Sequence, residues 1–127
     1  MRNEFQYKVK EFSSSVSQSL LLEILALNQD NTPEVGSLAS IKELQNLVTQ
    51  SSNNYYISLN DTVIAFMICF RERSSYHSDN YKFFSKKENK FLYVDRIAIK
   101  DTYRRKGIAT NLYSIIGLSL IIIGVLM

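Results

Sequence analysis

The sequence predicts a single α/β domain with the element order β-α-α-β-β-β-α. Three observations predict it. Two helix-length stretches with apolar residues three or four positions apart follow one short alternating run. Two β-rich runs then meet at an Asn-Asp pair, which indicates a tight hairpin. A third β-rich run leads into a basic, glycine-bearing turn and an apolar stretch that is typical of a helix.

The composition supports one packed domain over residues 1–127. Hydrophobic residues make up 46% of the chain and aromatic residues 12%, which is enough for a core and argues against disorder. The single cysteine, Cys69, has no disulfide partner in the chain and lies in the apolar run Val63–Phe70, so we expect a buried, unreactive thiol. Because no secretory signal is evident, we expect a cytoplasmic protein.

The N-terminal half is expected to hold one strand and two helices. Residues 5–10 alternate between apolar and polar side chains, as in a half-buried strand. The serines at 13–15 offer N-caps for a helix that ends before the loop of residues 28–37. Ser40 offers the cap of a second helix that ends near Gln50, with a glutamate three residues later as in a capping box.

The second half begins with a predicted hairpin. Its strands are Tyr55–Leu59 and Thr62–Phe70, and the Asn-Asp pair between them tolerates the positive φ angles of a two-residue turn. The run Thr62–Phe70 is apolar almost throughout, which is typical of a strand covered on both faces. Arg71–Asn89 is expected to be a long polar loop, and Phe91–Ile99 the next strand.

Charge is distributed unevenly along the chain. Residues 1–70 hold four basic and seven acidic side chains, whereas residues 71–106 hold eleven basic and five acidic ones, and residues 107–127 hold none. Positive charge therefore gathers near the basic turn, which suits an anionic ligand. It would also suit nucleic acid, but no recognised nucleic-acid module accompanies it, so none is expected as a partner.

The basic turn reads Arg104-Arg105-Lys106-Gly107-Ile108-Ala109. Backbone N–H groups at a helix start have no intrahelical acceptor and bind anions well, and glycine lets a ligand approach the main chain closely. The turn lacks the second glycine and the Lys-Ser or Lys-Thr of a Walker loop, and it lacks the three glycines of a dinucleotide fingerprint. The alternative is an ordinary solvated turn.

The pattern Arg104-x-x-Gly107-x-Ala109 resembles the signature with which the GNAT acyltransferase superfamily clasps the pyrophosphate of acetyl-CoA. The preceding strand, Tyr93–Ile99, stands at the distance that the family uses. The stretch 26–113, about two-thirds of the chain, resembles a little-characterised subgroup of predicted acetyltransferases. This resemblance implies a GNAT-type mixed, mostly antiparallel sheet with helices on both faces.

The resemblance also implies a function: an N-acetyltransferase in which a primary amine attacks acetyl-CoA, the co-substrate, directly. The strand before the turn would leave backbone groups unpaired for the pantetheine arm. The residues implied in cofactor binding are Ile97, Ala98, Ile99, Arg104, Arg105, Lys106, Gly107, Ile108, Ala109 and Thr110.

Two residues carry the implied catalytic roles. The Ile97 N–H would face the thioester oxygen. Asp95 is the candidate base that takes a proton from the amine, because strand alternation puts it on the face of Ile97. The alternative for Asp95 is a structural ion pair with a nearby basic side chain. Arg96 points to the other face and is expected to be structural.

Five residues are candidates for binding the amine acceptor: Asn28, Tyr76, His77, Tyr81 and Tyr93. The alternatives are ordinary packing for the tyrosines and a solvated loop position for the histidine. With a single histidine and no ligand spacing, no metal site is expected. The acceptor itself is left open by the sequence.

Residues 115–127 form an atypical apolar tail, because the family continues here with further strands and helices. We expect a truncated or frameshifted product; the alternatives are a short helix with a strand at Leu120–Val125, or a membrane anchor over Leu112–Met127, which is short for a span. A second hypothesis for function follows, a catalytically incomplete module that binds CoA or associates with itself as a homodimer. A membrane-tethered protein is the third.

Overall fold

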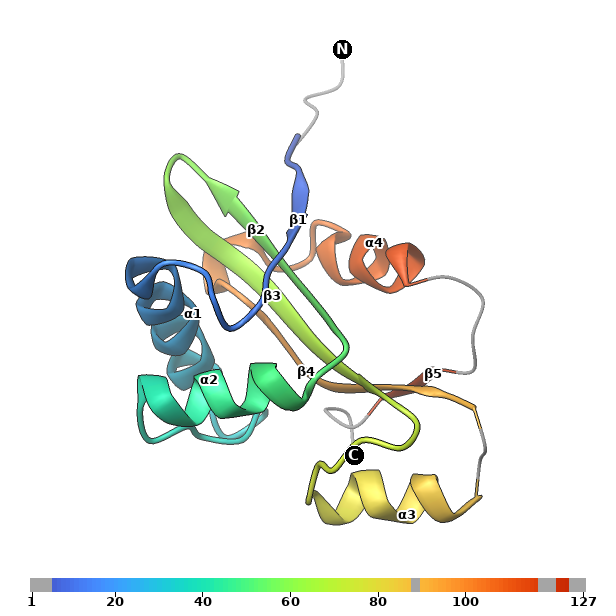
Figure 1. Cartoon of the computed structure of the whole chain (residues 1–127). Helices are drawn as coiled ribbons and strands as arrows, with labels where there is room; N and C mark the ends of the chain where they lie inside the picture. The colour runs from blue at the N-terminus through green and yellow to red at the C-terminus, as the bar shows by residue number, and fades with distance from the viewer. Residues whose placement is uncertain (1–5, 88–89, 117–120, 124–127) are drawn as a thin grey trace.

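The computed structural model describes residues 6–87, 90–116 and 121–123, and these form a five-stranded sheet with helices on both faces (Figure 1). The predicted α/β class and the mostly antiparallel sheet are confirmed. The elements in chain order are β1 (Val9–Glu11), α1 (Gln18–Asp30), α2 (Ile41–Gln50), β2 (Asn53–Leu59), β3 (Thr62–Arg71), α3 (Asp79–Lys87), β4 (Leu92–Ile99), the short 3-10 helix η1 (Asp101–Tyr103), α4 (Ile108–Ile115) and β5 (Ile121–Ile123).

The strands lie in the order β1-β2-β3-β4-β5. Neighbours are antiparallel from β1 to β4, while β5 is parallel to β4 and pairs only with Leu92–Val94. The second half of β4 therefore has no strand beside it on that edge among the described residues. This placement leaves main chain available at the end of β4 that leads into the basic turn.

The sheet separates two apolar clusters. Helices α1 and α2 cover one face, where residues such as Ile24, Leu44 and Phe66 pack together, and α4 covers the other, where Leu112 packs with Met67 (Figure 1). Strand β3 is buried on both faces from residue 63 to residue 70, as its continuous apolar run predicts. The core thus holds β3 and β4 rigidly between the two layers.

Helix α2 begins as predicted. The Glu43 N–H donates to the Ser40 hydroxyl at 3.2 Å, and the Glu43 carboxylate accepts from the Ala39 N–H at 3.0 Å, a close variant of the capping box. Helix α1 begins later than predicted. Its cap is Ser17, which accepts from the Leu20 N–H at 3.2 Å, so the expected caps at residues 13–15 are wrong.

Replacing Ser40 with Ala should lower the free energy of unfolding by about 1 kcal/mol, because an N–H of the first turn loses its acceptor. Urea unfolding followed by circular dichroism measures this. Ser40→Asp is the matched control, since aspartate caps equally well and should leave the midpoint near that of the wild type. Equal midpoints for Ser40→Ala and the wild type would contradict the capping role.

The hairpin between β2 and β3 is confirmed. Asn60 and Asp61 adopt φ angles of 52° and 62°, which are the left-handed conformations that a two-residue turn of this type requires. Asn and Asp adopt them at lower cost than other non-glycine residues. The local sequence therefore determines the turn and the pairing next to it, while an irregularity between Ile57 and Ser58 shifts the register farther along the two strands.

The expected loop Arg71–Asn89 is wrong in its second half, because residues Asp79–Lys87 form helix α3. The helix carries an acidic residue in its first turn and Lys86 and Lys87 in its last, a charge order that complements the helix dipole. Tyr81 anchors it: the side chain is buried and its hydroxyl donates to the Arg71 carbonyl. The order of charges at its two ends indicates a helix, but the segment has too few apolar residues to show a helical period.

The tail is only partly described. Strand β5 lies within the alternative strand Leu120–Val125, while residues 117–120 and 124–127 lie outside the described residues. The suggested anchor over Leu112–Met127 therefore also lies partly outside them. Of the helices that the structure describes, none has the length and apolarity needed to cross a bilayer.

Candidate functional site

The basic turn has an unusual backbone. Between η1 and α4, Arg105 and Gly107 adopt left-handed conformations, with φ angles of 64° and 79°. Alternation of left-handed with ordinary residues turns successive N–H groups toward one side and forms an anion-binding concavity. A Cβ on Gly107 would meet no described atom within 4 Å, so the space in front of this residue is open.

The amides of this turn have no acceptors within the part of the chain that the structure describes. Across the described residues, the backbone N–H groups of residues 105–110 make no hydrogen bond, whereas the flanking ones do: Arg104 donates to the Asp101 carbonyl and Asn111 to the Gly107 carbonyl. Six consecutive free donors at a helix start also meet the positive end of the helix dipole. The turn is thus prepared to bind a multivalent anion such as a diphosphate.

The three cations of the turn have different roles. The Arg104 guanidinium donates to the Asn31 side chain at 2.8 Å and to the Ile99 carbonyl at 3.3 Å, and lies 3.4 Å from the Asp101 carboxylate. It thereby ties the turn to the end of α1. The side chains of Arg105 and Lys106 are exposed and have no partner in the described part of the chain, so they are available to an anion.

The second half of β4 presents backbone groups at an open edge. The Lys100 N–H donates to the Ile64 carbonyl at 2.7 Å, which fixes the side of β4 that faces β3. Since main-chain groups alternate along a strand, those of Ala98 face β3, while those of Ile97 and Ile99 point toward the open edge. Of the three strand residues expected to bind a cofactor, Ile97 offers both its N–H and its carbonyl at this edge, and Ile99 offers its N–H, because the Ile99 carbonyl already accepts from Arg104.

A β-bulge interrupts β4 at Asp95. Ile68 pairs with Arg96 and Cys69 pairs with Val94, so Asp95 is an extra residue. Simple alternation would put Tyr93 and Ile97 on the same face of the sheet. Because of the bulge they lie on opposite faces: Tyr93 packs under α1 and α2, while Ile97 packs on the α4 side. The expectation that Asp95 shares the face of Ile97 is wrong for this reason.

The Asp95 carboxylate turns toward the α1 and α2 side and accepts two hydrogen bonds. The Tyr76 hydroxyl donates to one oxygen at 2.6 Å, and the Arg96 Nε donates to the other at 2.8 Å. The side chains of Asp95 and Arg96 are each 7% exposed. The Tyr76 ring stacks on Phe70 at 4.0 Å, and burial, together with the Asp95 carboxylate, raises the pKa of Tyr76.

Arg96 connects β4 to the α1–α2 segment. Its Nη1 donates to the Asn28 side-chain oxygen and to the Gly36 carbonyl, both at 2.8 Å. Asn28 is fully buried, and its amide nitrogen donates to the same carbonyl at 3.0 Å. Asn28 was expected to bind the acceptor, but here it positions the loop and offers no exposed surface. The Arg96 side chain lies on the same side of the sheet as the Asp95 carboxylate, so the expectation that these two residues point to opposite faces is wrong.

Two small cavities border this network. The first, the Arg96 cavity, has a volume of about 310 Å³, and its lining includes Arg96, Glu43, Tyr76 and His77. The second, the Lys82 cavity, has a volume of about 290 Å³, and its lining includes Tyr76, His77 and two lysines of α3. Tyr76 and His77 thus belong to both.

The remaining candidates for acceptor binding lie deeper. Tyr81 lines the Lys82 cavity but is 1% exposed, and Tyr93 is 2% exposed in the core under α1 and α2.

The free thiol of Cys69 lies buried on the α4 side, where burial, with Asp95 nearby, raises its pKa to about 12 and keeps it protonated at neutral pH. No cluster of three or more metal-ligating side chains occurs within the described ranges.

Several residues around the cavities have no functional signal in the sequence. The pattern around Glu43 indicates only a capping box, and Lys82 and Lys86 lie in a stretch whose polarity predicts a loop. Recognition of α3 from its end charges would have placed these two lysines four residues apart on one helix face. The sequence around Gly36 does not indicate its role, because its carbonyl accepts a hydrogen bond from Arg96, which is distant in sequence.

Comparison with known families gives a match to the sequence profile described as "Acetyltransferase (GNAT) family", over residues 21–116. This range includes the basic turn, β4 and the residues around both cavities. Comparison with curated protein sequences gave no significant match.

The fold is similar to those of several solved structures. A possible acetyltransferase from Clostridium difficile 630 is 18% identical, with a TM-score of 0.60 over 92% of this chain and 78% of that one. A ribosomal-protein-alanine N-acetyltransferase from Brucella melitensis biovar Abortus 2308 is 12% identical, with a TM-score of 0.62 over 93% and 79%. An aminoglycoside acetyltransferase from an uncultured soil metagenomic sample, in complex with sisomicin, is 16% identical, with a TM-score of 0.59 over 92% and 76%. At these identities the likeness establishes the fold.

Proposed function

Because the chain belongs to the acetyltransferase (GNAT) family, we propose that it transfers an acetyl group from acetyl-CoA to a primary amine by direct attack of the amine. The observation that carries the proposal is the row of six backbone N–H groups, residues 105–110, that have no acceptor among the described residues. A diphosphate needs several donors on one concave surface, and this turn supplies them.

The cofactor would lie along the turn and the open edge of β4. The amides of residues 105–110 bind the diphosphate, and Arg105 and Lys106 neutralise part of its charge. The edge-facing main-chain groups of Ile97 and the N–H of Ile99 bind the amide groups of the pantetheine arm in the manner of an added strand. A solved structure of similar fold, a NatC complex, is described as bound to a Gag peptide and CoA, which supports this assignment.

The chain's own groups suit a direct transfer. The Ile97 N–H points to the open edge, where it donates to the thioester oxygen as negative charge develops. Asp95 stands at the bulge two residues away and is the candidate to take the amine's proton. A protonated, buried Cys69 is unsuited to forming an acyl-enzyme, which favours attack by the amine itself.

Acetyl-CoA should stabilise the folded protein. At about 100 times the dissociation constant, the expected gain is about 2.7 kcal/mol, which corresponds to a rise in melting temperature on the order of 10 °C. Differential scanning fluorimetry measures this, with adenosine, which lacks the diphosphate, as the control ligand. Folded protein that shows no rise with millimolar acetyl-CoA would overturn the proposal.

One observation favours a second candidate, a module that binds CoA without turnover. Both Asp95 oxygens already accept hydrogen bonds, from Tyr76 and from Arg96, so the base is partly engaged. Release of free CoA from acetyl-CoA, followed with a thiol reagent over a panel of primary amines, separates the two. Amine-dependent release supports the transferase, and stabilisation by acetyl-CoA without release supports the module.

A further inference from the structure

We propose that the acceptor is an amine that also carries an anionic oxyacid group several bonds from its nitrogen, with that group bound in the Lys82 cavity. The inference rests on the proposed function, because it assigns the acceptor of that reaction. Its basis is the separation of charge between the two adjoining cavities that share Tyr76 and His77.

The Lys82 cavity suits an anion. Lys82 and Lys86 lie four residues apart on α3 and both line it, and neither has a partner within the described residues. The other lining residues are three serines, His77 and two tyrosines. The tyrosine hydroxyls already donate to Asp95 and to the Arg71 carbonyl, and the Ser74 hydroxyl donates to the Gln50 carbonyl, so the Ser75 and Ser85 hydroxyls and the His77 ring are the donors left beside the lysines. No described carboxylate lines the cavity. A carboxylate or phosphate placed there would gain two cations and several neutral donors.

The Arg96 cavity suits the amine. Its one cation, Arg96, is already neutralised by Asp95 at 2.8 Å, while the Glu43 carboxylate also belongs to the lining. The Glu43 carboxylate accepts from the Ala39 N–H but has no ion-pair partner among the described residues, so an ammonium group meets negative charge there before it loses its proton. Because Tyr76 and His77 stand between the cavities, one molecule that fills both must hold its two charged groups apart.

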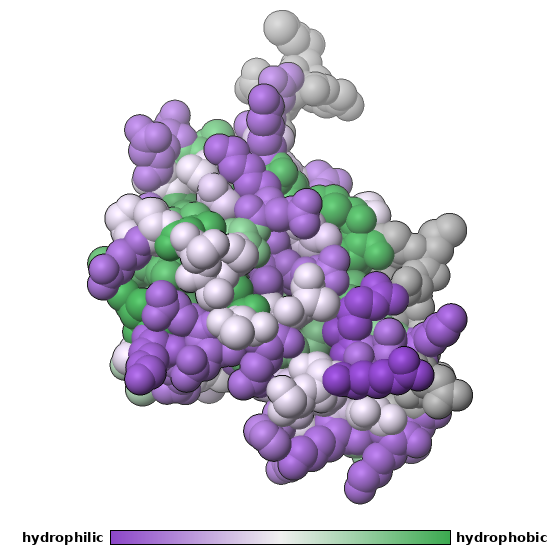
Figure 2. Space-filling view, in the orientation of Figure 1, coloured by the Kyte–Doolittle hydropathy of each residue, from purple (hydrophilic) through white to green (hydrophobic). Residues whose placement is uncertain are grey.

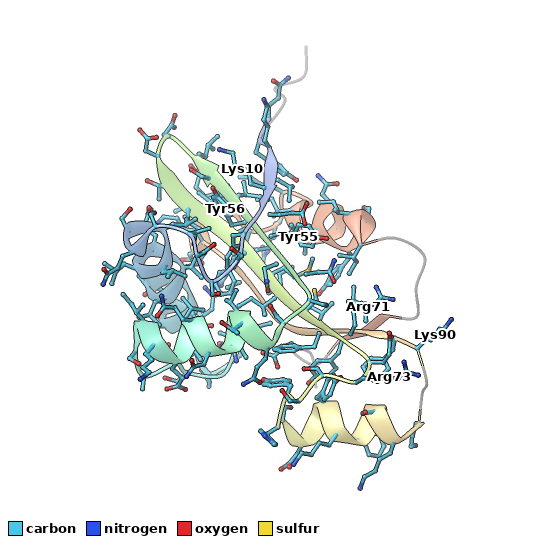
Figure 3. All side chains as sticks on the ribbon, in the orientation of Figure 1. Lys10, Tyr55, Tyr56, Arg71, Arg73 and Lys90 are labelled. Atoms are coloured by element: carbon cyan, nitrogen blue, oxygen red, sulfur yellow. The ribbon has the colours of Figure 1, made fainter. Side chains whose placement is uncertain are left out.

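Basic residues near α3 add to the positive charge around the Lys82 cavity. Arg71, Arg73 and Lys90 lie where β3 and β4 approach α3 (Figure 3), and the most hydrophilic patch in Figure 2 covers the position of the two arginines. Glu72 lies between them, with its carboxylate held by the Phe91 N–H at 3.0 Å, which lowers its pKa. Such a field attracts anionic acceptors and repels polycations.

The test compares three amines of one chain length: 6-aminohexanoate, hexylamine and 1,6-diaminohexane. In the wild type, kcat/KM for 6-aminohexanoate should exceed that for the other two by about tenfold, the factor expected of two partly exposed charge pairs. The double variant Lys82→Gln/Lys86→Gln should lose this advantage through a higher KM at unchanged kcat. Lys87→Gln is the matched control, because Lys87 is on the same helix, lies over the Phe83 ring and does not line the cavity.

A binding measurement keeps the test independent of turnover. Calorimetric titration of 6-aminohexanoate into CoA-loaded protein should give an affinity about tenfold weaker for the double variant than for Lys87→Gln. Equal affinities in these variants, or equal affinities of the wild type for 6-aminohexanoate and hexylamine, would overturn the inference. A different result would overturn the proposed function: acetyl-CoA that neither stabilises the protein nor is consumed in the presence of any amine.

Discussion

Replacing Arg96 with Met should lower the free energy of unfolding by about 3–5 kcal/mol, a large fraction of a small domain's stability. The guanidinium is 7% exposed and donates to three groups that lie on different elements: Asp95, Asn28 and the Gly36 carbonyl. Without it, the Asp95 carboxylate stays buried with the Tyr76 hydroxyl as its one side-chain donor among the described residues. Urea unfolding measures the change in free energy.

The loss of stability in Arg96→Met arises from the Asp95 carboxylate, which stays buried without its cation. A buried carboxylate without its cation pays a desolvation penalty that the folded state no longer offsets. The double variant Asp95→Asn/Arg96→Met removes both charges and should recover a substantial part of the loss. Coupling between the two sites in this cycle measures how far they act as one unit.

Arg71→Met is the matched control for the surface. Arg71 pairs with Glu72 at 3.8 Å and its side chain is 46% exposed, so its removal should change the unfolding free energy by less than about 1 kcal/mol. If the two arginine variants lose the same stability, burial of the Arg96 network is not what stabilises β4 against the α1–α2 segment.

Replacing Gly107 with Val should abolish the stabilisation by acetyl-CoA. The residue has a φ angle of 79°, which a β-branched side chain adopts only with strain, and its Cβ would stand in the open space before the free amides. Rotation of this peptide away from the left-handed region would also turn its neighbours' N–H groups out of the concavity. We expect affinity to fall by more than about 100-fold, or about 2.7 kcal/mol in ligand-induced stability. Fluorimetric melting with increasing acetyl-CoA measures it.

Gly36→Ala is the control glycine. Gly36 does not have a positive φ angle, and an added Cβ would lie 3.5 Å from the Arg96 side chain, an ordinary contact. Its response to acetyl-CoA should match that of the wild type. A Gly107→Val protein that is folded and still stabilised by acetyl-CoA would show that the turn is not the diphosphate site.

Several features could be predicted because their cause is local. The α2 cap depends on a serine and a glutamate three residues apart, and the hairpin on two residues that tolerate positive φ. The basic turn belongs to the same class, since Gly107 and the change from strand to helix are both visible in six letters of sequence. The family resemblance then placed these elements in one fold.

Other features could not be predicted because their cause is distant. The bulge at Asp95 depends on how β4 pairs with β3, and it moved the Asp95 carboxylate from the expected face to the side of Tyr76 and Arg96. A strand's period of two has no way to indicate an inserted residue. Burial of Asn28, which removed it from direct contact with an acceptor, likewise followed from packing against β4.

The linear order of residues alone determined where α2 begins, where the β2–β3 hairpin turns, where glycine permits a left-handed turn, and where positive charge accumulates. Each of these depends on interactions within a few residues, or on composition. Only the tertiary structure decided which main-chain groups stay free, which carboxylate is neutralised, and that two cavities of different polarity adjoin at Tyr76 and His77. Those properties arise when segments far apart in sequence exclude water together, and local preferences do not encode that arrangement.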